Sequence, residues 1–218
     1  MVFGFRKFGF YVNITLLLII LNVIIFFAAI IIDALTPLNV ISMFALSANP
    51  FEVITKPWML ITSMFLHAGP IHLLFNMLAL FFIGNYLESI LGERKFLLTY
   101  FVSGLCGGIA FILWETLTGG TIPAVGASGA IFGIFAALAM MRPNLRVFLF
   151  PLPIPITLPV AVMIAFFLAF FMFGGMVAHS AHFGGMVSGA VCGYYFRKQS
   201  GRQSYYGYGY DDHDYGRW

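Results

Sequence analysis

A serine among small residues, Gly126-Ala127-Ser128-Gly129, opens a short apolar segment of the chain, and an Ala181-His182 pair opens another. A serine hydroxyl is a weak nucleophile until a neighbouring base takes its proton. An ionisable side chain inside a membrane segment indicates a functional site. We therefore predict that Ser128 is a nucleophile and His182 its general base. In the alternative interpretation, Ser128 caps a helix, as serines commonly do, and His182 is a hydrogen-bonded core residue.

The spacing of small residues predicts how these two segments pack. Three glycines follow His182 at i+3, i+7 and i+11, which places them on one helical face with it: Gly185, Gly189 and Gly193. The segment that begins at Ser128 carries a similar face of small residues: Gly129, Gly133 and Ala137. Small residues allow two helices to approach backbone to backbone. Pairing of these faces would bring the serine and the histidine within reach of each other.

Two more polar residues, His72 and Asn76, stand at i and i+4 on one face of an earlier apolar segment. Both can donate hydrogen bonds without carrying a charge, which suits stabilisation of the oxyanion formed when a carbonyl is attacked. They could instead be polar contacts between helices, which are common in membrane bundles. His67 precedes Gly69-Pro70 and is predicted to lie outside the helix, where it would hold the preceding loop. His179 is a rival to His182 as the base.

Carboxylates are scarce where the predicted chemistry lies. The outer side of the chain offers only loop or helix-end residues: Asp33, Glu52 and Glu115. A Ser–His dyad is therefore a better hypothesis than a Ser–His–Asp triad, and an aspartyl protease is disfavoured. No His-Glu-x-x-His motif is present, so the familiar zinc-protease signature is missing. We predict neither a metal nor a cofactor.

Composition places these residues in a polytopic membrane protein. The chain has 218 residues, of which 61% are hydrophobic and only 9% charged, whereas soluble domains average about 25% charged. The first apolar run lacks a small-residue cleavage site and is as long as a full span, which favours a retained helix over a signal peptide. Six spans are predicted, over residues 11–32, 70–87, 96–114, 128–141, 157–173 and 178–196.

The remaining segments complete the predicted architecture, which is an all-α bundle of six transmembrane helices. The proline-rich residues 142–155 are expected at the membrane interface, and Pro159 is tolerated in the first turn of the fifth helix. One catalytic membrane domain would occupy residues 1–198. Residues 199–218 are rich in glycine, tyrosine and aspartate and are predicted to be a disordered tail.

Basic residues predict the orientation of this bundle. Of the eleven lysines and arginines, only Lys56 falls on the side opposite to the others in a six-span arrangement. The positive-inside rule therefore places both termini in the cytoplasm. The fourth predicted helix has 14 residues. Its length of about 21 Å is shorter than the hydrocarbon core of a bilayer, which is about 30 Å thick. If Arg142 marks the cytoplasmic face, Ser128 lies about 9 Å below the outer surface, in a protein-lined cavity.

In combination, these motifs resemble the rhomboid family of intramembrane serine proteases over nearly the whole chain. The resemblance rests on Gly126-Ala127-Ser128-Gly129, on Ala181-His182 with the glycines that follow, and on His67, His72 and Asn76. It implies Ser128 as nucleophile, His182 as base, and His72, Asn76 and the Ser128 amide around the oxyanion. It also implies a cell-membrane enzyme that opens to the extracytoplasmic side and cleaves single-span proteins without a cofactor.

The sequence also departs from the family pattern. Relatives often carry tyrosine four residues after the serine, stacked on the histidine, where this chain has Phe132. Three residues before the base, many have asparagine, and this chain has His179. A Trp-Arg pair common in the first loop is replaced by Trp58-Met59, so docking of that loop is expected to differ.

Two other functions stay open at this point. One is a catalytically silent, rhomboid-like protein that escorts membrane proteins, which is disfavoured because Ser128 and His182 are both present. The other is a transporter or channel in which four histidines form a proton relay or metal site: His67, His72, His179 and His182. Such relays usually employ carboxylates within the membrane, and none is predicted in the helix cores. No nucleic-acid partner is predicted, and the sequence does not indicate an oligomeric state.

Overall fold

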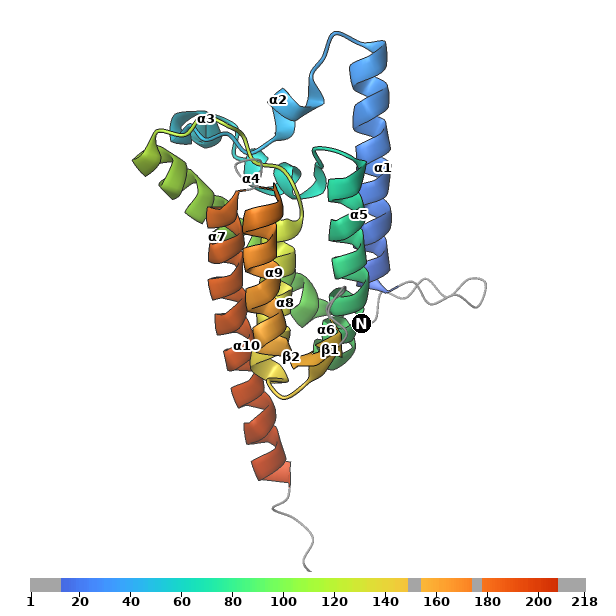
Figure 1. Cartoon of the computed structure of the whole chain (residues 1–218), viewed down its shortest axis with the longest axis vertical. Coiled ribbons are helices and arrows are strands. Elements are labelled where there is room, and N and C mark those ends of the chain that lie inside the picture. Colours follow the sequence, from blue (N-terminus) through green and yellow to red (C-terminus); the bar gives the residue numbers. More distant parts are fainter. Residues whose placement is uncertain (1–12, 149–153, 174–177, 208–218) are drawn as a thin grey trace, which may run out of the picture.

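A computed structural model describes residues 13–148, 154–173 and 178–207. It is mostly helical, with one small β-hairpin (Figure 1). The first half contains α1 (Ile14–Leu35), α2 (Val40–Phe44), α3 (Pro50–Thr55), α4 (Met59–Thr62), the 3₁₀-helix η1 (Ser63–Phe65), α5 (Pro70–Ala79), the π-helical segment η2 (Leu80–Gly84) and α6 (Asn85–Leu91). The second half contains α7 (Glu93–Thr118), α8 (Ser128–Met141), β1 (Arg146–Phe148), β2 (Pro155–Thr157), α9 (Leu158–Phe173) and α10 (His179–Gly207).

Helix α8 is the centre of the bundle, with α7, α9 and α10 packed against it (Figure 1). Every residue from Gly129 to Ala139 is buried. A helix that is apolar on all sides must be covered by protein or lipid on all sides, and here the other helices cover it. Its bounds agree with the predicted segment, because the preceding loop is rich in glycine and proline and Arg142 ends the apolar run. The residue that begins the central helix is Ser128.

The glycine face of α10 lies directly on α8, as the sequence predicts. A Cβ atom added at Gly189 would overlap the backbone carbonyl of Gly133, and Gly185 and Gly193 meet the backbone of Gly129 and Ala137 in the same way. No larger side chain fits between these two backbones. The ladder of contacts fixes the register between α8 and α10 along several turns.

On the other side of the bundle, α1 lies beside the continuous helical segment formed by α5, η2 and α6 (Figure 1). Gly84 permits close approach, because a Cβ there would come within 2.9 Å of the Thr15 side chain. Glu88 of α6 is buried and holds the first turn of α1. Its carboxylate accepts hydrogen bonds from the backbone N–H groups of Ile14 and Thr15, at 2.9 and 2.8 Å, and from the Thr15 hydroxyl at 2.6 Å. A negative charge at a helix N-terminus is also favoured by the helix dipole.

We expect Glu88→Gln to lower the free energy of unfolding by about 2 kcal/mol, because each hydrogen bond to a charged acceptor contributes about 1.5–3 kcal/mol and a neutral amide retains part of it. Thermal or denaturant unfolding in detergent micelles would measure the change. Glu52→Gln is the matched control: Glu52 is partly exposed and pairs with Lys56 at 2.8 Å, and such surface pairs contribute little. Equal destabilisation by both substitutions would show that Glu88 does not anchor α1.

Several predicted bounds need correction. The fold is mostly helical, as predicted, but residues 146–148 and 155–157 add a two-stranded antiparallel sheet in which Phe148 pairs with Pro155. The third predicted helix, 96–114, extends at both ends to become α7, and the second continues beyond residue 87 to Leu91. The sixth continues beyond residue 196 to Gly207. The helix thus includes residues 199–207 of the predicted tail, while residues 11–12 and 208–218 lie outside the described residues.

By length and composition, three of the described helical segments are able to cross a membrane: Ile14–Leu35, Pro70–Leu91 and Glu93–Thr118. Two shorter apolar helices are found at Ser128–Met141 and Leu158–Ala169. The described part of the chain is therefore that of a helical membrane protein, and the count of six spans stays a prediction.

Candidate active site

The loop before α8 is fixed by backbone hydrogen bonds that place Ser128. Leu46 and Ala124 exchange two backbone hydrogen bonds of 2.9 Å, and the Gly126 N–H donates to the Ser63 carbonyl at 2.9 Å. Gly126 has a φ of 125°, a conformation that only glycine adopts without strain. A Cβ at this position would also come within 2.8 Å of the His72 ring. The glycine thus serves both the turn and the close approach of an imidazole.

Ser128 and His182 form a hydrogen-bonded pair. The distance between the Ser128 Oγ and the His182 Nε2 is 2.7 Å. The histidine is buried, with 3% of its surface exposed, whereas Ser128 borders a pocket of about 50 Å³. With the His182 ring proton on Nδ1, the Nε2 lone pair accepts the serine hydroxyl hydrogen. This is the geometry of a nucleophile and its base.

Phe132 lies against the ring of His182, with 4.5 Å between the ring centroids and 34° between the ring planes. Phe166 of α9 contacts Phe132 edge-on, at 6.0 Å between centroids. The two phenylalanines limit rotation of the imidazole by packing alone. The Nδ1 atom of His182 is buried and has no hydrogen-bond partner among the described residues. No carboxylate accepts from it there, which suits a dyad.

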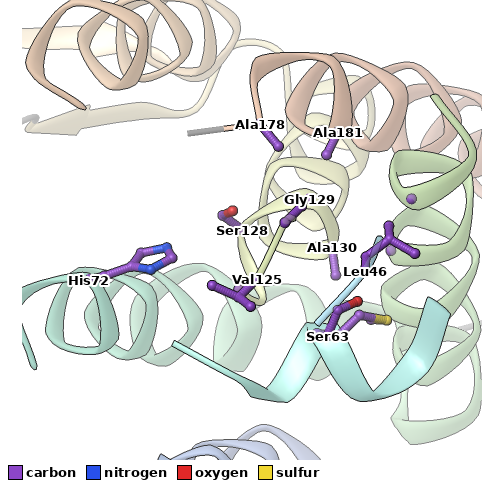
Figure 2. A pocket seen from close by; sticks show the side chains of 14 residues that line it. Leu46, Ser63, His72, Val125, Ser128, Gly129, Ala130, Ala178 and Ala181 are labelled. Carbon is purple, nitrogen blue, oxygen red and sulfur yellow. The ribbon is translucent and has the colours of Figure 1, made fainter. Parts of the chain in front are cut away.

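His72 and Asn76 lie one turn apart on α5, and His72 lines the pocket that Ser128 borders. Figure 2 shows the His72 ring pointing into the pocket that Ser128 lines. The Asn76 amide nitrogen donates to the backbone carbonyl of His72 at 2.8 Å, which uses one of its two hydrogens. The Ala68 N–H donates to the His72 Nδ1 at 3.4 Å. This contact leaves the Nε2 atom of His72 on the side of Gly126 and Ser128.

The two other predicted histidines lie beside this arrangement. His67 is buried outside α5, with its ring centroid 5.2 Å from that of His72. Burial lowers the pKa of His67 to about 4, so its imidazole is neutral at neutral pH. His179 begins α10, and its ring centroid is 6.3 Å from that of His182. The imidazole in hydrogen-bond contact with Ser128 is that of His182.

Sequence reasoning did not identify three residues that complete the site. Ser63 holds Gly126 through its carbonyl and borders the pocket, Leu46 fixes the loop, and Phe166 supports Phe132. All three act through contacts between elements far apart in the chain, and no local pattern marks them. Among the described residues, no group of three or more His, Cys, Asp or Glu side chains is arranged to hold a metal ion.

Comparison with known proteins shows similarity to one protein family. The family described as the rhomboid domain matches residues 55–199. YdcA, a rhomboid-family protein of Bacillus subtilis (strain 168), is 46% identical over 84 residues, which are 38% of this chain and 41% of YdcA. The rhomboid protease GluP of the same organism is 35% identical over 136 residues, 62% of this chain and 26% of GluP. Inactive RHOMBOID-like protein 8 of Arabidopsis thaliana is 33% identical over 81 residues, 37% of this chain and 22% of that protein. The matches span less than half the length of each relative.

Proposed function

This chain belongs to the rhomboid family, and on that premise we propose that it is an intramembrane serine endopeptidase with a Ser128–His182 dyad. The observation that carries the proposal is the 2.7 Å contact between the Ser128 Oγ and the His182 Nε2. Because the family includes relatives named as proteases and one named as inactive, membership alone does not decide between catalysis and binding. The presence and pairing of both residues favour catalysis.

In the proposed reaction, the Ser128 Oγ attacks the carbonyl carbon of a peptide bond while the His182 Nε2 takes the hydroxyl proton. The carbonyl oxygen becomes an oxyanion. The protonated His182 then gives the proton to the departing amine, which leaves an ester between Ser128 and the new carboxyl end. Water, deprotonated by His182, attacks this ester and restores the free serine. Atoms and protons balance over the cycle, with one water consumed for each bond cut.

Three donors are proposed for the oxyanion: the backbone N–H of Ser128, the His72 Nε2–H and the Asn76 amide. The first lies at the start of α8, where N–H groups have no partner within the helix and the helix dipole is positive. The His72 ring lines the same pocket as Ser128, and Asn76 is buried one turn farther along α5. Gly126 makes room for the His72 ring and Gly129 allows α10 to approach α8 closely, and Phe132 packs against the His182 imidazole.

We expect Asn76→Ala to lower kcat by about 10²-fold with little change in KM, because loss of one oxyanion donor costs this much in the transition state and little in the ground state. His72→Ala should have a similar or milder effect. Initial rates over a range of substrate concentrations would separate kcat from KM. An unchanged kcat for both variants would assign the two residues to helix packing.

The proposed setting is the cell membrane, crossed six times, with both termini in the cytoplasm and the active site open to the extracytoplasmic side. The distribution of basic residues along the chain supports this orientation. Substrates would be single-span membrane proteins that reach Ser128 from the lipid bilayer. No cofactor is invoked, and nucleic acid is not a proposed partner.

A cleavage assay tests the proposed function against its alternatives. The purified chain would be incubated in lipid with a model single-span substrate, with and without EDTA, beside the Ser128→Ala variant. A serine protease yields two fragments regardless of EDTA, and the variant yields none. A silent binding protein binds the substrate without cutting it, and cleavage that is lost with EDTA and restored by zinc would favour the histidines as a metal site.

A further inference from the structure

A second hollow lies at the end of α8 opposite to Ser128, with a volume of about 630 Å³. It is bounded by the end of α6, the turn that follows α8, and α10. Figure 1 shows this region beside the β-hairpin, at the far end of α8 from the loops of the active site. Nothing in the proposed proteolytic chemistry uses it.

Part of the lining of the hollow is positively charged. Arg142 and Arg197 both line it, both are exposed, and no lining residue is acidic. One nitrogen of Arg197 donates to the Met140 carbonyl at 3.2 Å, so its guanidinium is held at the C-terminal end of α8 with most of its donors still available. The nearby carboxylate of Glu88 is engaged with the first turn of α1. The exposed side chain of Asn144 adds a neutral donor.

Apolar residues also line the hollow. Three of them are half-buried: Ile90, Met141 and Leu145. Met141 is the last residue of the apolar helix α8, and Arg142 follows directly. The hollow therefore lies where apolar surface changes to charged surface, which is the level of lipid headgroups in a protein that spans a bilayer.

We propose that this hollow binds an anionic phospholipid, with the headgroup phosphate between Arg142 and Arg197 and the upper acyl chains against Ile90 and Met141. Guanidinium groups bind phosphate oxygens through paired hydrogen bonds. A soluble phosphate ion would contact only the arginines. A lipid would contact the arginines through its headgroup and the apolar residues through its acyl chains. A lipid with net negative charge is favoured because no carboxylate lines the hollow.

Native mass spectrometry of the full chain in detergent tests the proposal. The protein would be titrated with phosphatidylglycerol or with phosphatidylcholine of the same acyl chains, and the bound lipid counted. We expect tighter binding of phosphatidylglycerol, weakened about fivefold by Arg142→Gln and by Arg197→Gln and about 25-fold by the double variant, since each basic residue near an anionic lipid contributes about 1 kcal/mol. Arg197→Lys should keep most of the binding.

Arg94→Gln is the matched control, because Arg94 is an exposed residue in the first turn of α7 that does not line the hollow. It should leave the preference for phosphatidylglycerol unchanged. The proposal is overturned if Arg94→Gln weakens binding as much as Arg142→Gln, since general surface charge would then suffice. It is also overturned if the double variant binds like the original chain, or if excess inorganic phosphate displaces the lipid completely.

Discussion

Replacement of Ser128 or of His182 by alanine is expected to lower kcat by at least about 10⁴-fold, and the double variant should be no slower than either single one. Without the base, the serine hydroxyl keeps its proton, and without the hydroxyl, the base has no nucleophile to activate. The two residues act as one unit because their reacting atoms are already 2.7 Å apart. Rates of fragment formation from a single-span substrate in lipid would measure the losses.

Two controls make this result specific. Ser188→Ala removes a serine whose hydroxyl donates only to carbonyls of its own helix, those of Gly184 and Gly185, and should leave the rate nearly unchanged. His179→Ala should retain measurable activity, because the His182 imidazole is the one in contact with Ser128. An inactive His179 variant beside an active His182 variant would show that the base has been misassigned.

The second large effect is expected at the contact between α8 and α10. A Cβ at Gly185 would come within 2.8 Å of the Gly129 carbonyl carbon, and backbone atoms cannot rotate away as a flexible side chain could. Gly185→Ala should therefore separate the helices and lower the free energy of unfolding by about 1–3 kcal/mol, the usual cost of overpacking. It should also lower kcat by about 10²-fold, because a displacement of about 1 Å is enough to disturb reacting groups.

Comparison with other glycines sharpens this prediction. Gly189→Ala meets the backbone of Gly133, one turn farther from the dyad, and should destabilise to a similar extent with a smaller loss of kcat. Gly69→Ala has no atom within 4 Å of the added Cβ and should change neither quantity. Melting temperatures and cleavage rates of the three variants would be compared. If Gly185→Ala matched Gly69→Ala in both, close backbone packing would not position the dyad.

The central helix and its partner were predictable because their signals are local and strong. Ser128 follows a loop rich in glycine and proline, Arg142 ends the apolar run, and the glycine spacing on α10 matches the small residues on α8. The contact between Ser128 and His182 follows from that packing. The roles of His72 and Asn76 in catalysis stay predictions, because their placement beside the pocket does not show what they stabilise.

Other features escaped prediction for physical reasons. The proline-rich residues 142–155 were expected only to lie at the membrane interface, yet Pro155 occupies the first position of β2, where a missing N–H is tolerated. The end of α7 was placed too early because Glu115, Thr116 and Thr118 are polar, although Gly119, with a φ of 73°, is a common helix stop. The hydrogen bonds between Glu88 and the first turn of α1 join residues more than seventy positions apart. Such contacts depend on the tertiary structure and leave no local pattern.

Covalent labelling of the nucleophile tests the central claim most directly. The intact protein in lipid would be treated with a fluorophosphonate, and the modified residue identified by mass spectrometry of its peptides. We predict modification at Ser128 in the original chain and in His179→Ala, and loss of the label in Ser128→Ala and His182→Ala, since only a serine paired with its base reacts readily. A label on another residue, or cleavage of substrate by a protein in which Ser128 cannot be labelled, would contradict the account.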